Sequence, residues 1–234
     1  MFFDCAKGTF YNNLFVVAVS TGMRIGELAA LRWSDIDWKT NVIKVTRTLV
    51  YQKYEDDEQK SFHFENPKTA TSKRNIPINH QCEMALKRQY MQKNVIAQKA
   101  PKSKSVDKQY ADLLFTTKFD TPINSQIICE AIKKVVDEIE VFSPHCFRHT
   151  FETRCFEACI QPKTVQAYLG HASLQMTMDL YTSVMPKHMS NEMDKVSEVL
   201  DRLSTNGDTI TEDSYNKAVQ NNKIISFYGD SVVV

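Results

Sequence analysis

The chain has 234 residues, of which 42% are hydrophobic and 24% charged, and its net charge is +1. These values are typical of a globular protein and exclude a chain that is disordered throughout. No apolar run reaches about 18 residues and no signal-peptide pattern opens the sequence, so we expect no membrane association and a cytoplasmic location. A charge near zero argues against nucleic-acid binding, since such domains are often strongly basic.

The charge is unevenly distributed along the chain. Residues 1–186 carry 24 basic and 20 acidic side chains, whereas residues 187–234 carry 5 basic and 8 acidic ones. A basic run from Lys87 to Lys108 fits either a solvated helix and loop or a patch that faces phosphates. The six cysteines form no CxxC pair, so we expect reduced thiols without a bound metal.

The first third of the chain is predicted to combine helices with strands. A buried helix is expected over residues 9–20, and Thr21-Gly22 separates it from a second helix over 24–31. Alternating and β-branched residues predict three strands, at residues 41–51, 61–66 and 76–78. These strands would form one small antiparallel sheet.

From residue 80 onward the pattern is helical. Helices are expected over residues 80–99, 123–140, 143–160, 162–170, from the cap Ser173 through Tyr181, and over 188–203. A strand-like tail closes the chain at residues 224–234. The predicted fold class is therefore α+β, mainly α with a small antiparallel β-sheet.

Four segments contain residues that are suited to chemistry on phosphates. They are T-G-M-R-I-G-E-L with Arg24, P-K-T-A-T-S-K-R-N-I-P-I with Lys68, S-P-H-C-F-R-H-T-F with His145 and Arg148, and L-G-H-A-S-L-Q-M-T-M-D-L-Y with His171 and Tyr181. Taken singly, such residues are more often surface salt bridges, polar turns or core aromatics. The pair His145 and His149 could also hold a metal, but the H-E-x-x-H pattern of zinc proteases is absent.

Taken together, the six residues are cations, hydrogen-bond donors and a hydroxyl nucleophile. Two Arg forks can hold phosphate oxygens, and fixed positive charge can replace a metal at an anionic transition state. The hydroxyl of Tyr181 can attack phosphorus, and Lys68 on a hairpin can protonate the leaving oxygen.

The order and context of these segments resemble the tyrosine recombinase (phage integrase) family, from about residue 10 to residue 185. The similarity extends to integrases of conjugative transposons. It implies the catalytic-domain fold of that family and a site-specific DNA recombinase that integrates or excises mobile elements. It also implies a 3′-phosphotyrosyl intermediate, no cofactor, no metal and no ATP. The expected partners are double-stranded DNA, further copies of the protein in a tetramer on synapsed DNA, and an accessory DNA-bending protein.

The resemblance assigns a role to each residue. Tyr181 would attack the scissile phosphate, Arg24 and Arg148 would hold its non-bridging oxygens, and His171 would donate a hydrogen bond to one of them. A second group serves proton transfer and support. Lys68 would protonate the 5′ oxygen, His145 would assist proton transfer at the nucleophile, and Glu27 would support the pocket without reacting.

The resemblance also predicts the domain organisation. Residues 1–186 would form the catalytic domain, and residues 187–234 a C-terminal helix and tail that is exchanged between protomers or docks on its own core. Few residues precede Arg24, so we expect the core-binding and arm-binding domains of the family to be absent. Two alternatives remain open: DNA relaxation like that of type IB topoisomerases, and a catalytically silent DNA-binding or assembly module.

Overall fold

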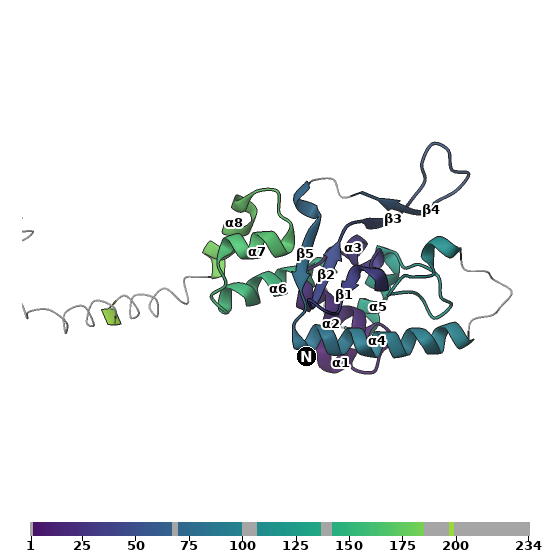
Figure 1. The fold of residues 1–234 in the computed structure, drawn as a ribbon, viewed down its shortest axis with the longest axis horizontal. Coiled ribbons are helices and arrows are strands. Elements are labelled where there is room, and N and C mark those ends of the chain that lie inside the picture. Colours follow the sequence, from purple (N-terminus) through teal and green to yellow (C-terminus); the bar gives the residue numbers. More distant parts are fainter. Residues whose placement is uncertain (1, 67–69, 100–106, 137–141, 185–196, 199–234) are drawn as a thin grey trace, which may run out of the picture. The chain divides into compact units, whose positions relative to one another are not determined.

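A computed structural model describes residues 2–66, 70–99, 107–136, 142–184 and 197–198, and residues 1–184 form one compact unit (Figure 1). Its helices are α1 (Phe2–Ala6), α2 (Asn12–Thr21), α3 (Ile25–Ala29), α4 (His80–Lys99), α5 (Ser125–Val135), α6 (His145–Glu157), α7 (Pro162–Leu169) and α8 (Leu174–Val184). Its strands are β1 (Ile36–Asp37), β2 (Val42–Val45), β3 (Thr48–Gln52), β4 (Ser61–Glu65) and β5 (Arg74–Pro77). The mainly helical fold with few antiparallel strands confirms the predicted fold class.

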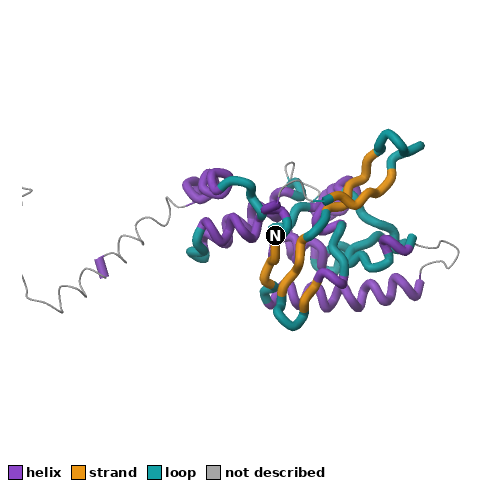
Figure 2. Tube along the Cα trace, turned by 45° about the horizontal axis from the view of Figure 1, so that its top comes forward, coloured by secondary structure: helices purple, strands orange, loops and turns teal. Residues whose placement is uncertain are grey.

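The strands form two small sheets, not the single sheet expected from the sequence. One sheet has the order β1-β2-β5, and β3 pairs with β4 in a separate hairpin that projects from the body (Figures 1 and 2). The stretch predicted as one strand over residues 41–51 is therefore divided between the two sheets. The division falls at Thr46 and Arg47, where the Arg47 guanidinium turns to the buried carboxylate of Asp35 at 2.6 Å.

Local sequence explains where several helices begin and end. Asn124 caps α5, because its side chain accepts a hydrogen bond from the Ile127 amide at 2.9 Å. Pro162 opens α7 at a position where a backbone N–H has no partner within the helix. The long helix α4 has the predicted bounds and packs against α2. The short N-terminal helix α1 was not predicted.

Two apolar clusters lie side by side in this unit. The larger cluster joins α2, α3, the β1-β2-β5 sheet, α4 and α5, and it includes the stacked rings of Phe15 and Phe147. The smaller cluster lies between α6, α7 and α8 around Phe156 and Leu169. The helices α2 and α7, one from each cluster, end on glycines in the left-handed conformation. The functional side chains gather around these two helix ends.

The C-terminal predictions fall mostly outside the described residues. Of the helix expected over 188–203, only residues 197–198 are described, and they are helical. The tail at 224–234 lies outside the description, so its docking, in cis or between protomers, stays a prediction. Within the described ranges, no helix has the length and apolar character needed to cross a membrane.

Candidate functional site

The C-terminal end of α7 binds three arginines. Three consecutive backbone carbonyls each accept a hydrogen bond from a different guanidinium. These pairs are Arg74 Nε to Tyr168 (2.6 Å), Arg148 Nη2 to Leu169 (2.8 Å) and Arg24 Nη2 to Gly170 (3.4 Å). The last carbonyls of a helix lack partners within the helix and lie at the negative end of its dipole, so cations are stabilised there. We call Arg24, Arg74 and Arg148 the three-arginine cluster.

Glycine at position 170 is required by the backbone of this site. Gly170 ends α7 with φ of 65°, in the left-handed region that glycine adopts without strain. A Cβ atom here would lie 2.9 Å from the Thr71 carbonyl oxygen, closer than such contacts allow. The sequence Leu169-Gly170-His171 therefore turns the chain directly beneath the arginines.

Glu27 supplies the negative charge that holds two of the arginines. Its two carboxylate oxygens accept from Arg74 Nη1 and Nη2 at 3.0 and 2.8 Å, and one of them accepts from Arg24 Nη1 at 3.0 Å. Burial disfavours the charged carboxylate, but the hydrogen bonds and charge of Arg74, assisted by Arg24, outweigh burial and lower the pKa of Glu27. Glu27 is thus an anion that fixes the arginines in place, as predicted for a supporting residue.

Arg148 differs from the other two arginines in its partners. It is buried on α6, and its Nη1 donates to the carbonyl of Gly22, at the end of α2, at 2.7 Å. Among the described residues, no carboxylate lies within ion-pair distance of it. Burial and the nearby charges of Arg24 and Arg74 lower the pKa of Arg148 to about 10, so it remains charged at neutral pH. The cluster therefore carries positive charge that a bound anion would neutralise.

His171 follows the α7 end and lies almost completely buried beside the cluster. Its Nδ1 lies 2.8 Å from the hydroxyl of Thr177 on α8 and 3.9 Å from a carboxylate oxygen of Glu152 on α6. Burial, followed by the charges of Arg148, Arg24 and Arg74, lowers the pKa of His171 to about 4. The ring is therefore neutral at neutral pH, when it can donate a hydrogen bond from one nitrogen only.

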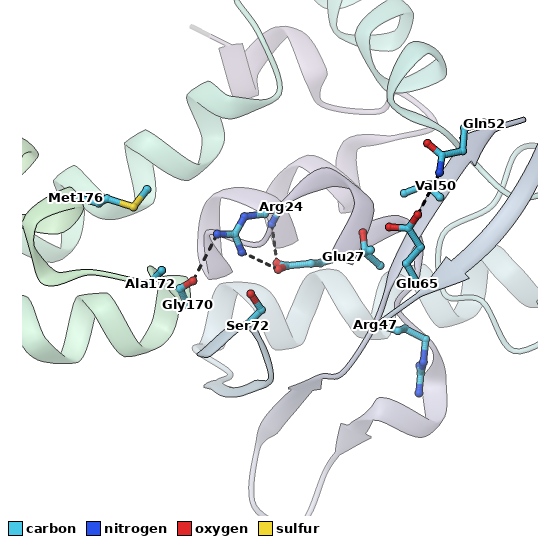
Figure 3. Close-up of a pocket in the computed structure, with 11 residues that line it drawn as sticks. Arg24, Glu27, Arg47, Val50, Gln52, Glu65, Ser72, Gly170, Ala172 and Met176 are labelled. Carbon is cyan, nitrogen blue, oxygen red and sulfur yellow. Dashed lines mark hydrogen bonds and ion pairs between the residues drawn. The ribbon is translucent and has the colours of Figure 1, made fainter. Parts of the chain in front are cut away.

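A cavity of about 560 Å³ opens beside Arg24. Figure 3 shows Arg24 between Glu27 and the Gly170 carbonyl, with Met176 of α8 on one side and the β3-β4 hairpin on the other. The hairpin contributes polar side chains to the wall, including Gln52 and Glu65. The cavity thus lies between the α7 end and the projecting hairpin.

The structure brings together three of the six predicted site residues. Arg24, Arg148 and His171 meet around the end of α7. His145 is exposed in the first turn of α6, one turn before Arg148. Lys68 lies outside the described residues, so its place in the site stays a prediction.

Tyr181 is held in the smaller apolar cluster. Its partly buried ring packs edge-on against Phe156, with ring centroids 5.1 Å apart. No hydrogen bond from its hydroxyl to the three-arginine cluster is present among the described residues.

Two buried charged residues near the site were not predicted. Arg74 lies in the same segment as Lys68, and the signal for it is a cation at the start of the short strand β5. Glu152 lies four residues after Arg148 on the buried face of α6, and that spacing is the signal for it. Within the described part of the chain, no three His, Cys, Asp or Glu side chains gather as a metal site requires.

Comparisons with known proteins agree with this fold. Residues 4–188 match the model of the phage integrase family. A "tyrosine recombinase XerC-like" protein of Caldanaerobacter subterraneus is 30% identical over 204 residues, which cover 84% of this chain and 51% of the relative. The transposase from transposon Tn916 of Enterococcus faecalis is 25% identical over 206 residues, or 84% of this chain and 48% of the relative.

Solved structures show the same relationship. The integrase of transposon Tn1549, in complex with transposon right end DNA, has 25% identity and a TM-score of 0.66 over 84% of this chain and 63% of that one. The XerA recombinase has the same fold, with 22% identity and a TM-score of 0.55 over 82% of this chain and 61% of that one. This chain belongs to the phage integrase family. It spans about half the length of the relatives that it matches.

Proposed function

We propose that the protein is a site-specific DNA recombinase that integrates or excises a mobile element. The observation that carries the proposal is the three-arginine cluster: three guanidiniums bind carbonyls at one helix end, and among the described residues the one carboxylate bonded to the cluster is Glu27, which accepts from Arg24 and Arg74. Such a cluster suits an anion with several oxygens, and a DNA phosphate is one. Family membership and the DNA-bound relative support this choice of anion.

In the proposed reaction, the hydroxyl of Tyr181 attacks a phosphate in one DNA strand. The bond from phosphorus to the 5′ oxygen breaks, and a 3′-phosphotyrosyl bond forms in its place. Negative charge grows on the non-bridging oxygens, where Arg24 and Arg148 stabilise it without reorganisation. Attack by the 5′-hydroxyl of another strand reverses the step, so the reaction consumes no ATP.

The remaining predicted residues move or hold protons. Lys68 donates a proton to the departing 5′ oxygen, and His145 assists proton removal from Tyr181. His171 donates a hydrogen bond to a non-bridging oxygen. These assignments come from the family resemblance, and the burial of His171 beside two arginines supports the last of them.

The proposal extends to partners and location. We infer that the protein acts on double-stranded DNA as a tetramer on two synapsed sites, assisted by a DNA-bending protein, in the cytoplasm. The relative bound to transposon right end DNA supports the DNA partner.

Replacement of Arg148 tests the role of the cluster. We expect Arg148→Gln to reduce the rate of strand cleavage about 10²–10³-fold, because one preorganised donor to the developing charge is lost. Cleavage is measured on a pool of nicked duplexes of randomised sequence, and DNA affinity is measured in parallel. We expect affinity to change far less than cleavage, since many phosphates contribute to binding.

Arg154→Gln is the matched control. Arg154 lies on the same helix, and its side chain is 74% exposed in an ion pair with Glu157. This control should cleave like the wild type. Equal cleavage by the Arg148→Gln variant and the wild type would refute the proposed role of the cluster.

A further inference from the structure

Glu152 is a buried acid with a carboxylate oxygen that has no hydrogen-bond partner among the described residues. Its side chain is 4% exposed, and one carboxylate oxygen, Oε1, is fully buried without a hydrogen-bond partner among the described residues. Leaving such an oxygen unpaired destabilises the fold, so a role for it is expected. The same oxygen is the one that lies 3.9 Å from Nδ1 of His171.

The contacts of the His171 ring determine which of its two nitrogens can bind a ligand. Its contacts with Thr177 and Glu152 are both made by Nδ1. The opposite nitrogen, Nε2, is then the one available to a ligand. A phosphate oxygen that binds to Nε2 needs a proton there, and a second proton on Nδ1 would make the ring a charged and stronger donor.

The groups that face this pair come from several elements. Arg148, His149 and Cys155 lie on α6, Arg24 precedes α3, and Arg74 is in β5. The arginines oppose a positive charge on His171 while no anion is bound. A bound phosphate would reverse this effect, because its negative charge neutralises the cluster.

We propose that Glu152 is a positioning residue for His171: it holds a proton that moves to Nδ1 when a phosphate binds. This inference rests on the proposed function and adds a residue to it. The O–H bond of the Glu152 carboxyl breaks and an N–H bond forms at Nδ1, so no outside proton is needed. The product is a carboxylate that forms an ion pair with an imidazolium, whose Nε2–H donates to the phosphate.

The acidities of the two groups agree with this direction of transfer. Burial raises the pKa of Glu152 to about 7, although Arg148 opposes the shift. Burial and the arginines lower the pKa of His171 to about 4. Before a phosphate binds, the shared proton therefore resides on Glu152 up to about neutral pH.

Nuclear magnetic resonance of the whole chain follows both groups at once. Ring ¹⁵N shifts report the protonation of His171, and the side-chain ¹³C shift reports that of Glu152. On addition of duplex DNA at pH 6.5, we expect His171 to become an imidazolium while Glu152 becomes a carboxylate. A ring that stays neutral with DNA bound, or a Glu152 that keeps its proton, overturns the proposal.

Two variants add a kinetic readout. We expect Glu152→Gln to slow covalent adduct formation at least ~10-fold at pH 6.5. We also expect the rate of the wild type to fall above about pH 7, and the rate of Glu152→Gln to stay constant over that range. Glu157→Gln, an exposed acid of the same helix, should match the wild type. Identical pH profiles for Glu152→Gln and the wild type overturn the proposal.

Failure of the proposed function can be distinguished from failure of the proposed role of Glu152. If the wild-type protein forms no adduct, the proposed function fails, and the resonance shifts still decide whether the proton is shared. If Glu152→Gln does not fold, as its thermal melting would reveal, the wild-type shifts alone decide.

Discussion

At the scale of single residues, the site is governed by how buried charges are compensated. Glu27 bonds to Arg24 and Arg74, whereas Arg148 has only backbone carbonyls among the described residues. Within the same described ranges, no cation is bonded to Glu152. Arg74 is thus paired with Glu27 as a support, Arg24 is paired with it at one nitrogen, and Arg148 has no carboxylate partner among the described residues and keeps its charge for a ligand.

Arg74 should be essential for stability. Arg74→Ala leaves the Glu27 carboxylate buried with Arg24 as its remaining cation, and breaking a buried pair costs about 3–5 kcal/mol. Urea denaturation measures this loss in the free energy of unfolding. Arg154→Ala removes one partner of an exposed pair and should cost at most about 1 kcal/mol. Equal losses in the two variants would contradict the supporting role of Arg74.

The pH dependence of stability should reveal Glu152. Burial raises the pKa of Glu152 in the folded protein to about 7 from its ordinary value of 4.5, so folding disfavours the carboxylate and stability falls as pH rises from about 4.5 through 7. Glu152→Gln cannot ionise. Relative to the wild type, it should therefore gain up to about 3 kcal/mol in unfolding free energy between pH 5 and pH 8. A constant difference between the two proteins over this range would show that Glu152 is not buried as described.

At the scale of elements, two helix ends determine the shape of the site. The carbonyl of Gly22 at the end of α2 and that of Leu169 at the end of α7 both accept hydrogen bonds from Arg148. The glycines allow both helices to stop where the arginines need acceptors. The ends of α2 and α7 thus link the two apolar clusters through one guanidinium.

Replacement of Gly170 tests whether the end of α7 requires a glycine. Gly170→Ala combines left-handed strain with a Cβ atom 2.9 Å from the Thr71 carbonyl oxygen. Gly8 also has a positive φ, of 82°, but a Cβ atom there would lie more than 4 Å from every heavy atom outside Gly8 and its two chain neighbours. We expect Gly170→Ala to cost about 1–3 kcal/mol more than Gly8→Ala in thermal or urea unfolding. Equal costs would mean that the turn at the end of α7 can relax.

The sequence predicts these elements unevenly, for physical reasons. Pro162 predicts the start of α7 well, because this signal acts within one turn of helix, whereas α5 ends at Val135 and not at the predicted residue 140. The division of residues 41–51 into β2 and β3 could not be predicted, because it depends on Arg47 reaching Asp35 in another segment. Local alternation contains no information about such a contact.

At the scale of the whole molecule, the net charge is a poor guide to function. A value of +1 argues against nucleic acid, yet the three-arginine cluster brings cations together from distant segments, with the side chains of Arg74 and Arg148 buried and that of Arg24 39% exposed. Arg24 and Arg148 were predicted from the order of motifs, whereas Arg74 and Glu152 became visible only through their contacts. The sequence could not predict that Tyr181 packs against Phe156, because that contact depends on how α6 and α8 meet.

The central claim is that Tyr181 joins the protein covalently to DNA beside the three-arginine cluster. The most direct test incubates the protein with nicked duplexes of randomised sequence in a chelating buffer and separates covalent adducts on a denaturing gel. We predict an adduct for the wild type and for Tyr51→Phe, which alters an exposed tyrosine, and none for Tyr181→Phe. Peptide mapping should locate the DNA on Tyr181. An adduct that persists in Tyr181→Phe, or that forms only when Mg²⁺ is added, would contradict the account.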